Sequence, residues 1–379
     1  MVNSIPIFKG LDGVVVDETQ VSKVDVDKSQ LYYRGYNIRQ LSEHASFLET
    51  AYLLLYGTLP DLSEFATFEN EERLSRDIPE SLYKLFTSVP KQAHPMDYLR
   101  LGVSYLGLLE KNQTLGDTDE TETRRRAVSL FSKIPTILAN GYRTVMGLPI
   151  IKPNKDLSYS ENLLYMILGT KDPDDLSIKV FDTSLILYAE HGFNASTFSA
   201  RLTASTLSDY YAAISSAIGT LKGPLHGGAN EQVLVLLNSI ASPDIAADLI
   251  RHKLSRKEKI MGFGHRLYRK GDSRVSIIAE LGKQLADQRA NHDLHRIGKK
   301  VQDIMMEEKN MHPNLDFPAA IAYHLLGIPS PLFTPLFVAS RVTGWSAHIL
   351  EQYRDNRLIR PNCHYVGHEE RPVPPLSQR

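Results

Sequence analysis

Apolar positions recur at helical spacing along most of the chain, and the alternating pattern typical of strands is confined to the first 40 residues. There, short runs of valine, leucine and tyrosine lie between Val14 and Tyr33 and are separated by glycines. This pattern predicts two or three small antiparallel strands. The predicted fold class is therefore mostly α, with a small N-terminal β element.

Several of the expected helices have recognisable features. Ser46 and Glu49 have the spacing of a capping box at the start of an amphipathic run. Pro135 falls inside a long helix expected over residues 123–139, where it predicts a kink. The other helices that the periodicity predicts cover residues 97–110, 160–168, 181–190, 243–254, 273–287, 294–308, 318–326 and 334–353.

Two further segments stand out by composition. Residues 211–219 read Tyr-Ala-Ala-Ile-Ser-Ser-Ala-Ile-Gly, so small side chains occupy most faces of a predicted helix and another helix can approach closely. Such a helix is typical either of a tightly packed interior or of a subunit interface. The tail from His368 to Arg379 contains three prolines and no helical period, which predicts an extended arm outside the core.

The composition excludes several classes of protein. The chain has 379 residues with 43 Lys and Arg against 44 Asp and Glu, and this near-neutral balance argues against a disordered chain or a dedicated nucleic-acid binder. No run approaches the ~18 apolar residues of a membrane span, and residues 1–10 lack the features of a secretory signal. We therefore expect a cytoplasmic protein, and its length suggests two domains.

Common chemical signatures are absent from the sequence. The single cysteine, Cys363, excludes an internal disulfide and a cysteine-based metal cluster. The chain contains no phosphate-binding loop, no complete dinucleotide-binding glycine motif, no zinc-protease helix and no serine-hydrolase elbow. Nucleotide hydrolysis, hydride transfer and serine hydrolysis are therefore weak hypotheses.

Three segments instead place a histidine beside glycines at a predicted helix boundary. They contain His191, His226 and His265 and read Glu-His-Gly-Phe-Asn, Leu-His-Gly-Gly-Ala-Asn-Glu and Gly-Phe-Gly-His-Arg. Glycine lets backbone or substrate approach the imidazole, and histidine can donate or accept a proton near neutral pH. One such histidine is more often a turn residue, but three in one chain favour a functional site without naming its reaction.

A basic stretch surrounds one of these histidines. Residues 251–274 contain nine Lys or Arg and two acids, Glu258 and Asp272. Such a run is usually a solvated surface, yet around a Gly-Phe-Gly-His turn it favours an anionic ligand. Nucleic acid is the weaker alternative, because only Phe263 and Tyr268 are available there for base stacking. A phosphorylated cofactor or a carboxylate substrate fits better.

The last candidate is Asp316, which precedes Phe317, Pro318 and a predicted helix. An acid at that place is ordinarily a helix N-cap. The alternative is a general base held among apolar neighbours, where burial adjusts its pKa. The residues alone leave both interpretations open.

Together these segments resemble those of citrate synthases. The matching segments occur in the family's order and at compatible spacings, and they cover residues 191–196, 225–231, 262–266, 314–317 and 354–361. The resemblance extends over nearly the whole chain, including the short N-terminal strands. The length of the chain is similar to that of the shorter archaeal and bacterial members.

The resemblance implies a mostly α-helical homodimer in which each subunit has two domains. The large domain would comprise residues 1–221 and 326–379, and the small domain, 222–325, would close over the substrates. Helix 211–219 would then lie at the dimer interface. The implied reaction is condensation of acetyl-CoA with oxaloacetate followed by hydrolysis of the thioester, with acetyl-CoA as co-substrate and no tightly bound cofactor or metal.

The family's motifs also imply roles for individual residues. Asp316 would remove a proton from the thioester methyl group, His226 would stabilise the enol or enolate, and His265 would protonate the oxaloacetate carbonyl. The other matching residues would bind substrates. Those for oxaloacetate are His191, Arg274, Arg341 and, from the other subunit, Arg360; those for coenzyme A are Lys259, Ile260, Met261, Gly262, Phe263 and Arg269.

One departure from the family concerns the acyl group. After Asp316 the sequence reads Phe-Pro-Ala-Ala, where many relatives have a serine or a glycine-containing turn. The pocket could therefore admit a longer acyl chain, which makes 2-methylcitrate synthesis from propionyl-CoA, or dual specificity, the close alternative. A non-catalytic helical dimer that only binds acyl-CoA is a more distant alternative.

Overall fold

The computed structural model describes residues 6–110, 116, 118–169, 173–268 and 270–379. Helices occupy most of these residues, and the three short strands found among them form one sheet. The predicted fold class, mostly α with a small N-terminal β element, is confirmed. Within these ranges, no helix is both long and apolar enough to cross a bilayer.

The sheet is an antiparallel meander near the N-terminus. Its strands are β1 (Ser22–Asp25), β2 (Gln30–Tyr33) and β3 (Tyr36–Asn37), in that spatial order. Tyr33 on β2 is fully buried, so one face of the meander packs against the helical body. The apolar run at residues 14–16, which contributed to the strand prediction, lies outside the sheet.

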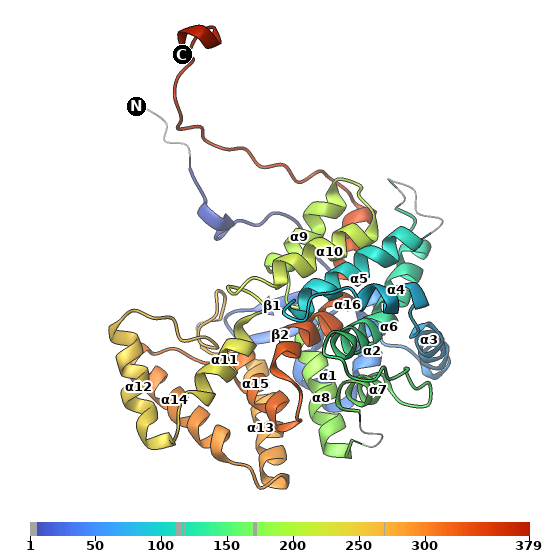
Figure 1. Cartoon of the computed structure of the whole chain (residues 1–379), viewed down its shortest axis with the longest axis vertical. Helices are drawn as coiled ribbons and strands as arrows, with labels where there is room; N and C mark the ends of the chain where they lie inside the picture. The colour runs from blue at the N-terminus through green and yellow to red at the C-terminus, as the bar shows by residue number, and fades with distance from the viewer. Residues whose placement is uncertain (1–5, 111–115, 117, 170–172, 269) are drawn as a thin grey trace.

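The helices that follow the sheet build the larger part of the molecule (Figure 1). Those before residue 222 are α1 (Ile38–His44), α2 (Phe47–Tyr56), α3 (Leu62–Ser75), α4 (Glu80–Phe86), α5 (Pro95–Leu109), α6 (Glu120–Val145), α7 (Tyr159–Leu168), α8 (Asp175–Tyr188), α9 (Ala195–Ser205) and α10 (Tyr210–Leu221). The helices predicted over 97–110 and 160–168 are confirmed as α5 and α7. The helix predicted over 181–190 corresponds to α8, which both begins and ends earlier than predicted.

A second group of helices gathers on one side of the body in Figure 1. It consists of α11 (Ala229–Asn238), α12 (Pro243–Ser255), α13 (Ser273–Gln288), α14 (Asp293–Lys309) and α15 (Asp316–Leu325). The last helix, α16 (Phe333–Arg354), returns to the body. A separate small domain with bounds at 222 and 325 stays a prediction.

Pro135 lies inside α6, which nevertheless continues unbroken to Val145. Proline has no N–H to donate to the carbonyl of Phe131, four residues earlier. The Tyr159 hydroxyl lies 3.5 Å from that carbonyl and 3.2 Å from the Ala339 carbonyl, which is the nearer acceptor for its single proton. The helix therefore runs past the proline with one backbone hydrogen bond fewer, and the predicted kink stays a prediction.

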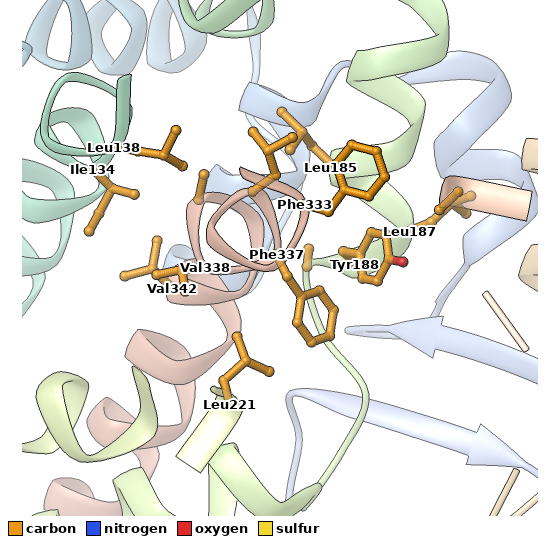
Figure 2. Close-up of a cluster of buried hydrophobic side chains, with 14 of the residues drawn as sticks. Ile134, Leu138, Leu185, Leu187, Tyr188, Leu221, Phe333, Phe337, Val338 and Val342 are labelled. Carbon is orange, nitrogen blue, oxygen red and sulfur yellow. The ribbon is translucent and has the colours of Figure 1, made fainter. Parts of the chain in front are cut away.

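Helix α16 forms the centre of the body. Nearly all of its side chains are buried, which is the pattern of a helix enclosed on every side. Figure 2 shows Phe333, Phe337, Val338 and Val342 of α16 among side chains of α6, α8 and α10. This rigid helix is one of the elements that position the candidate site.

Helix α10 contains the small-residue segment 211–219. Ala213, Ile214 and Ala217 are fully buried on the face that packs against α9, α5 and α16. Tight interior packing of this helix is confirmed. The opposite face is only partly covered within one chain, and a role of that face in a subunit interface stays a prediction.

The chain beyond α16 leaves the body as an extended segment (Figure 1). This is the arm predicted from the prolines in the tail, and only residues 376–378 within it form a helical turn. Apolar side chains on this segment are exposed, among them Leu358, Tyr365, Val366, Val373 and Leu376.

Candidate active site

Asp316 is the first residue of α15, and its carboxylate does not cap that helix. Leu315 occupies the N-cap position and no side-chain cap bond is made there, so the N-cap interpretation of Asp316 is wrong. Instead, the Tyr188 hydroxyl at the end of α8 donates to Oδ1 of Asp316 at 2.7 Å. The Asp316 N–H donates to Oδ1 of Asn314 at 3.1 Å.

Burial gives this carboxyl group an unusual affinity for protons. Desolvation raises the pKa of Asp316 to about 6, and the Tyr188 hydrogen bond, Arg274 and Arg341 oppose this rise. The group is therefore ionised at neutral pH, yet it accepts a proton more readily than an exposed aspartate. Both properties suit a general base.

A short antiparallel pairing of loops ties the segment before His265 to the segment before Asp316. The backbone of residues 262–264 pairs with that of residues 312–314 through hydrogen bonds of 2.9 Å in both directions. The loop that leads into His265 is thereby tied to the turn that leads into Asp316. Two motifs that are distant in sequence become one structural unit.

Gly262 is the tightest point of this unit. Its φ is +84°, and a Cβ added there would lie 2.5 Å from Val233 Cγ2 and 2.9 Å from Phe317 Cδ2. We expect Gly262→Ala to lower the free energy of unfolding by about 1–3 kcal/mol more than Gly13→Ala, because overpacking adds to the backbone strain. Gly13 has a φ of +72° and open space around it, which makes it the matched control. Denaturant unfolding measures both, and equal losses would contradict the tight packing.

His265 has a defined ring orientation. Its Nδ1 accepts the backbone N–H groups of Leu267 at 3.0 Å and Tyr268 at 3.2 Å. Because backbone N–H groups only donate, the proton of the neutral ring lies on Nε2. Burial, assisted by Arg274, lowers the pKa of His265 to about 4, so the ring is neutral at pH 7 and presents an N–H donor at Nε2.

His226 has the opposite arrangement. It lies in the loop between α10 and α11, where its Nε2 accepts the backbone N–H of Ser196 at 3.3 Å and lies 2.8 Å from the Ser196 hydroxyl. The proton of the neutral ring is therefore on Nδ1, which has no hydrogen-bond partner among the described residues. Burial, followed by the charge of Arg341, lowers the pKa of His226 to about 4.

His191 follows α8 and completes a group of three aromatic rings. Its Nε2 lies 3.3 Å from the Tyr268 hydroxyl, and its ring centre lies 5.0 Å from that of His265. Burial lowers the pKa of His191 well below its usual value, and the charges of Arg274 and His265 add to this effect. His191 is therefore neutral, and its ring packs edge-on against the ring of His265.

Two buried arginines face the same region. Arg274, in the first turn of α13, forms an ion pair with Asp272 at 2.7 Å and donates to the Leu187 carbonyl at 3.2 Å. Arg341, in the middle of α16, donates from Nε to the Tyr188 carbonyl at 2.6 Å. Arg341 makes no ion pair within 4.0 Å in the part of the chain that the structure describes, so it can bind an anionic ligand.

Aromatic contacts connect the two ends of the cluster. The Tyr188 and Phe337 rings, both labelled in Figure 2, lie 4.4 Å apart, and the His226 ring lies 6.2 Å from Phe337. Tyr188 in turn holds Asp316. The structure thus brings together six of the residues that the sequence singled out, which are His191, His226, His265, Asp316, Arg274 and Arg341.

The residues predicted to bind coenzyme A form the segment before His265. Ile260 is buried, Met261 and Phe263 are half-buried, and Lys259 is exposed. The Phe263 ring packs on that of Phe317 at 4.7 Å. Arg269 lies outside the described residues.

Arg360 does not join the cluster of its own chain. It is exposed on the segment after α16 and donates to Asn362 at 2.9 Å. No contact between Arg360 and the site histidines or Asp316 is present among the described residues. Its predicted contribution to a second copy stays a prediction.

Acidic side chains from other segments offset part of the positive charge of the basic stretch at 251–274. Arg251 pairs with Glu307 and Glu308 at 3.1 and 2.6 Å, and Arg266 pairs with Asp12 at 3.4 Å. These acids come from distant segments, so the local sequence count could not include them. No group of three or more His, Cys, Asp or Glu side chains in the described ranges is placed to hold a metal ion.

Several residues of the site were not predicted. Tyr188 and Phe337 lie in predicted helices and were not singled out, and Ser196 was named only as the end of the matching segment 191–196, without a role. Each acts here through a contact with a distant element, and no local pattern marks such contacts. Asp272, the partner of Arg274, was counted only as a charge in the basic stretch.

Comparison with known proteins shows which family this chain resembles over most of its length. The family model described as citrate synthase, C-terminal domain, matches residues 10–362. The chain is 46% identical to 2-methylcitrate synthase 2 of Corynebacterium glutamicum, over 98% of both chains. It is 44% identical to citrate synthase of Mycolicibacterium smegmatis, over 96% of both chains. A solved structure with a similar fold is that of citrate synthase from Thermoplasma acidophilum, in ternary complex with carboxymethyl coenzyme A and oxaloacetate. It matches with a TM-score of 0.93 and 31% identity, over 99% of this chain and 100% of that one.

Proposed function

Because the chain belongs to the citrate synthase family, we propose that it condenses acetyl-CoA with oxaloacetate and hydrolyses the resulting thioester to citrate and CoA. One observation carries this proposal. An ionised carboxylate, Asp316, lies in a cluster with two neutral imidazoles, His226 and His265, whose N–H donors have no hydrogen-bond partner among the described residues. A module that only binds acyl-CoA has no need for this combination.

The first step is proton transfer from the acetyl methyl group. Asp316 accepts the proton, and the electron pair of the broken C–H bond forms the enolate of the thioester. Negative charge then develops on the thioester oxygen, where His226 Nδ1–H donates a hydrogen bond. The contacts of Ser196 keep His226 in the tautomer that this step requires.

The second step forms the carbon–carbon bond. The nucleophilic carbon attacks the ketone carbon of oxaloacetate, and His265 donates its Nε2 proton to the ketone oxygen as charge develops there. Arg274, Arg341 and His191 bind the two carboxylates of oxaloacetate. The absence of an ion-pair partner on Arg341 within the described chain supports this role. Water then cleaves the thioester and releases CoA.

Other parts of the proposal extend beyond the cluster. Residues 259–263, together with Arg269, bind coenzyme A, and the small domain at 222–325 closes over both substrates. A homodimer completes the site, because Arg360 is supplied by a second copy. The exposed apolar side chains of the segment that carries Arg360 support such an interface.

The second candidate is 2-methylcitrate synthesis from propionyl-CoA. It is favoured by the 46% identity to a 2-methylcitrate synthase. Propionyl-CoA has one more methylene than acetyl-CoA, and one methylene in an apolar pocket changes specificity by only about 10- to 200-fold. The same catalytic residues serve both reactions, since Asp316 removes a proton from the carbon next to the thioester in each.

A side-by-side rate comparison tests both candidates. We expect the protein to release CoA from acetyl-CoA only when oxaloacetate is present, and to accept propionyl-CoA with a kcat/KM within about 200-fold of that for acetyl-CoA. A thiol reagent follows CoA release, and product analysis identifies citrate or 2-methylcitrate. Butyryl-CoA serves as the control for pocket size. If neither acetyl-CoA nor propionyl-CoA were cleaved, the proposed function would be wrong.

A further inference from the structure

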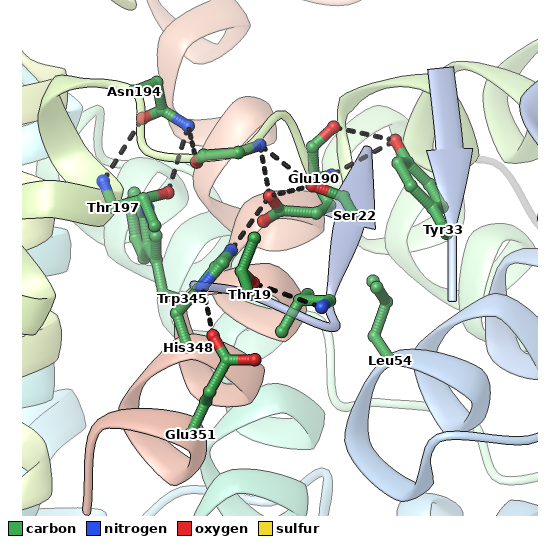
Figure 3. A network of polar contacts seen from close by, with 12 residues as sticks. Thr19, Ser22, Tyr33, Leu54, Glu190, Asn194, Thr197, Trp345, His348 and Glu351 are labelled. Atoms are coloured by element: carbon green, nitrogen blue, oxygen red, sulfur yellow. Dashed lines mark hydrogen bonds and ion pairs between the residues drawn. The ribbon is translucent and has the colours of Figure 1, made fainter. Parts of the chain in front are cut away.

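A buried polar network surrounds Glu190, the residue that precedes His191 in the chain (Figure 3). The side chains of Glu190 and His348 are fully buried, and His348 Nε2 lies 3.0 Å from Glu190 Oε1. The Ser22 hydroxyl, on β1, donates to the same carboxylate oxygen at 2.9 Å. None of these residues takes part in the reaction steps above, so their burial next to the site needs a separate explanation.

The network holds the residues on both sides of His191. On one side, the Gly192 N–H donates to Glu190 Oε1 and to Ser22 Oγ, the latter at 3.1 Å. On the other side, the Tyr33 hydroxyl accepts the Glu190 N–H at 3.1 Å and donates to the Glu190 carbonyl at 3.0 Å. The backbone that carries the His191 ring is therefore fixed before and after it.

The buried pair at the centre of the network is shifted toward its charged form. Burial disfavours both charges, but the attraction between them outweighs it, so the pKa of His348 is raised and that of Glu190 is lowered. On the other side of the His348 ring, Glu351 lies 3.5 Å from Nδ1 and accepts from Arg201 at 2.8 Å. A paired charge in the interior tolerates few geometries, which makes it a stiff support.

The backbone of α16 also approaches this loop closely. A Cβ added at Gly344 would meet the Ala189 carbonyl oxygen and the Glu190 Oε2 atom. A side chain at Gly344 would therefore displace the Glu190 carboxylate. Glycine there lets α16, which carries both Arg341 and His348, lie against the loop that carries His191.

We propose that Glu190 and His348 are positioning residues that hold the His191 ring in the orientation in which it binds oxaloacetate. The inference deepens the proposed function and rests on it, because it concerns the oxaloacetate contact of that same site. It assigns to the buried ion pair a role in oxaloacetate affinity. Acyl-CoA affinity should depend on it much less, because the network touches the His191 loop and not the segment 259–263.

His348→Leu is the main test of this inference. It removes the donor to Glu190, and we expect the KM for oxaloacetate and its calorimetric Kd to rise about 10- to 100-fold, the scale of the effect of removing a buried hydrogen bond to a charged group. The KM for acetyl-CoA should change little. His348→Gln places an amide N–H near the position of Nε2, and we expect it to recover most of the affinity.

Two further variants keep the test decisive. Ser346→Ala, on the same helix, removes a buried hydroxyl that bonds Tyr210 at 2.7 Å and does not touch the His191 loop, so oxaloacetate affinity should stay unchanged. If His348→Leu does not fold, Ser22→Ala takes its place as the test, because it removes a smaller part of the network. We expect Ser22→Ala to raise the oxaloacetate Kd severalfold. Unchanged oxaloacetate binding in His348→Leu, or in Ser22→Ala in its place, would overturn the inference. Failure of the wild-type protein to release CoA would instead overturn the proposed function.

Discussion

Asp316→Asn is expected to abolish turnover of acetyl-CoA with oxaloacetate while the fold and oxaloacetate binding persist. The amide cannot accept the methyl proton, so the rate of CoA release should fall about 10³-fold or more, near the upper range for a positioned base. Asparagine keeps the shape of the side chain, and its Oδ1 can still accept the hydrogen bond from Tyr188. A thiol assay measures the rate, and calorimetry with oxaloacetate is the control. Near-normal turnover would exclude Asp316 as the base.

The stability of the same variant provides an independent check. The folded wild-type protein keeps a proton on Asp316 up to about pH 6, whereas the unfolded chain loses it near 3.8. The folded state thus binds more protons between these values, and the free energy of unfolding falls as the pH rises through them. Asparagine removes this penalty, so Asp316→Asn should be more stable than the wild type at pH 8, and the difference should shrink toward pH 4. A less stable variant at pH 8 would indicate damage to the fold.

The pH dependence of the wild-type rate follows from the same group. Only the carboxylate form of Asp316 accepts a proton, so kcat/KM should fall as the pH drops through about 6. His226 and His265, whose pKa values burial lowers to about 4, stay neutral over this range and do not shape this limb. An acid limb near pH 4 would point to a different titrating group.

Local patterns in the sequence predicted much of the fold. The capping box at Ser46 forms with both of its hydrogen bonds, because the two residues it needs are three positions apart. Helices α3 (Leu62–Ser75) and α1 (Ile38–His44) were missed for physical reasons. In α3 only Phe68 and Glu72 are buried, so no apolar periodicity marks it, and α1 has only seven residues.

The candidate site was predicted as a set of motifs, whereas the contacts between those motifs could not be predicted. Tyr188 holds Asp316 from 128 positions away, and His348 holds Glu190 from 158 positions away. Such pairs depend on how helices pack, which a local pattern does not encode. Likewise, the tautomers of His226 and His265 are set by backbone N–H groups that become visible only in the folded chain.

His226 is the other residue whose replacement should have a large effect. His226→Gln loses the donor at the position of Nδ1, and we expect kcat to fall about 10²- to 10³-fold, the range for removing one donor to a developing oxyanion. Oxaloacetate binding should persist, because in the proposed mechanism His226 contacts only the thioester. Thiol-release kinetics and oxaloacetate calorimetry measure the two effects separately.

His226→Asn is the matched control, because its amide nitrogen can occupy the position of Nδ1. We expect His226→Asn to be the more active of the two variants, since it can still donate to the thioester oxygen. The reverse order would mean that the catalytic donor is Nε2. The Ser196 N–H donates to Nε2 at 3.3 Å in this structure. That hydrogen bond would then have to break when the substrate binds, so that Nε2 and not Nδ1 donates to the thioester oxygen.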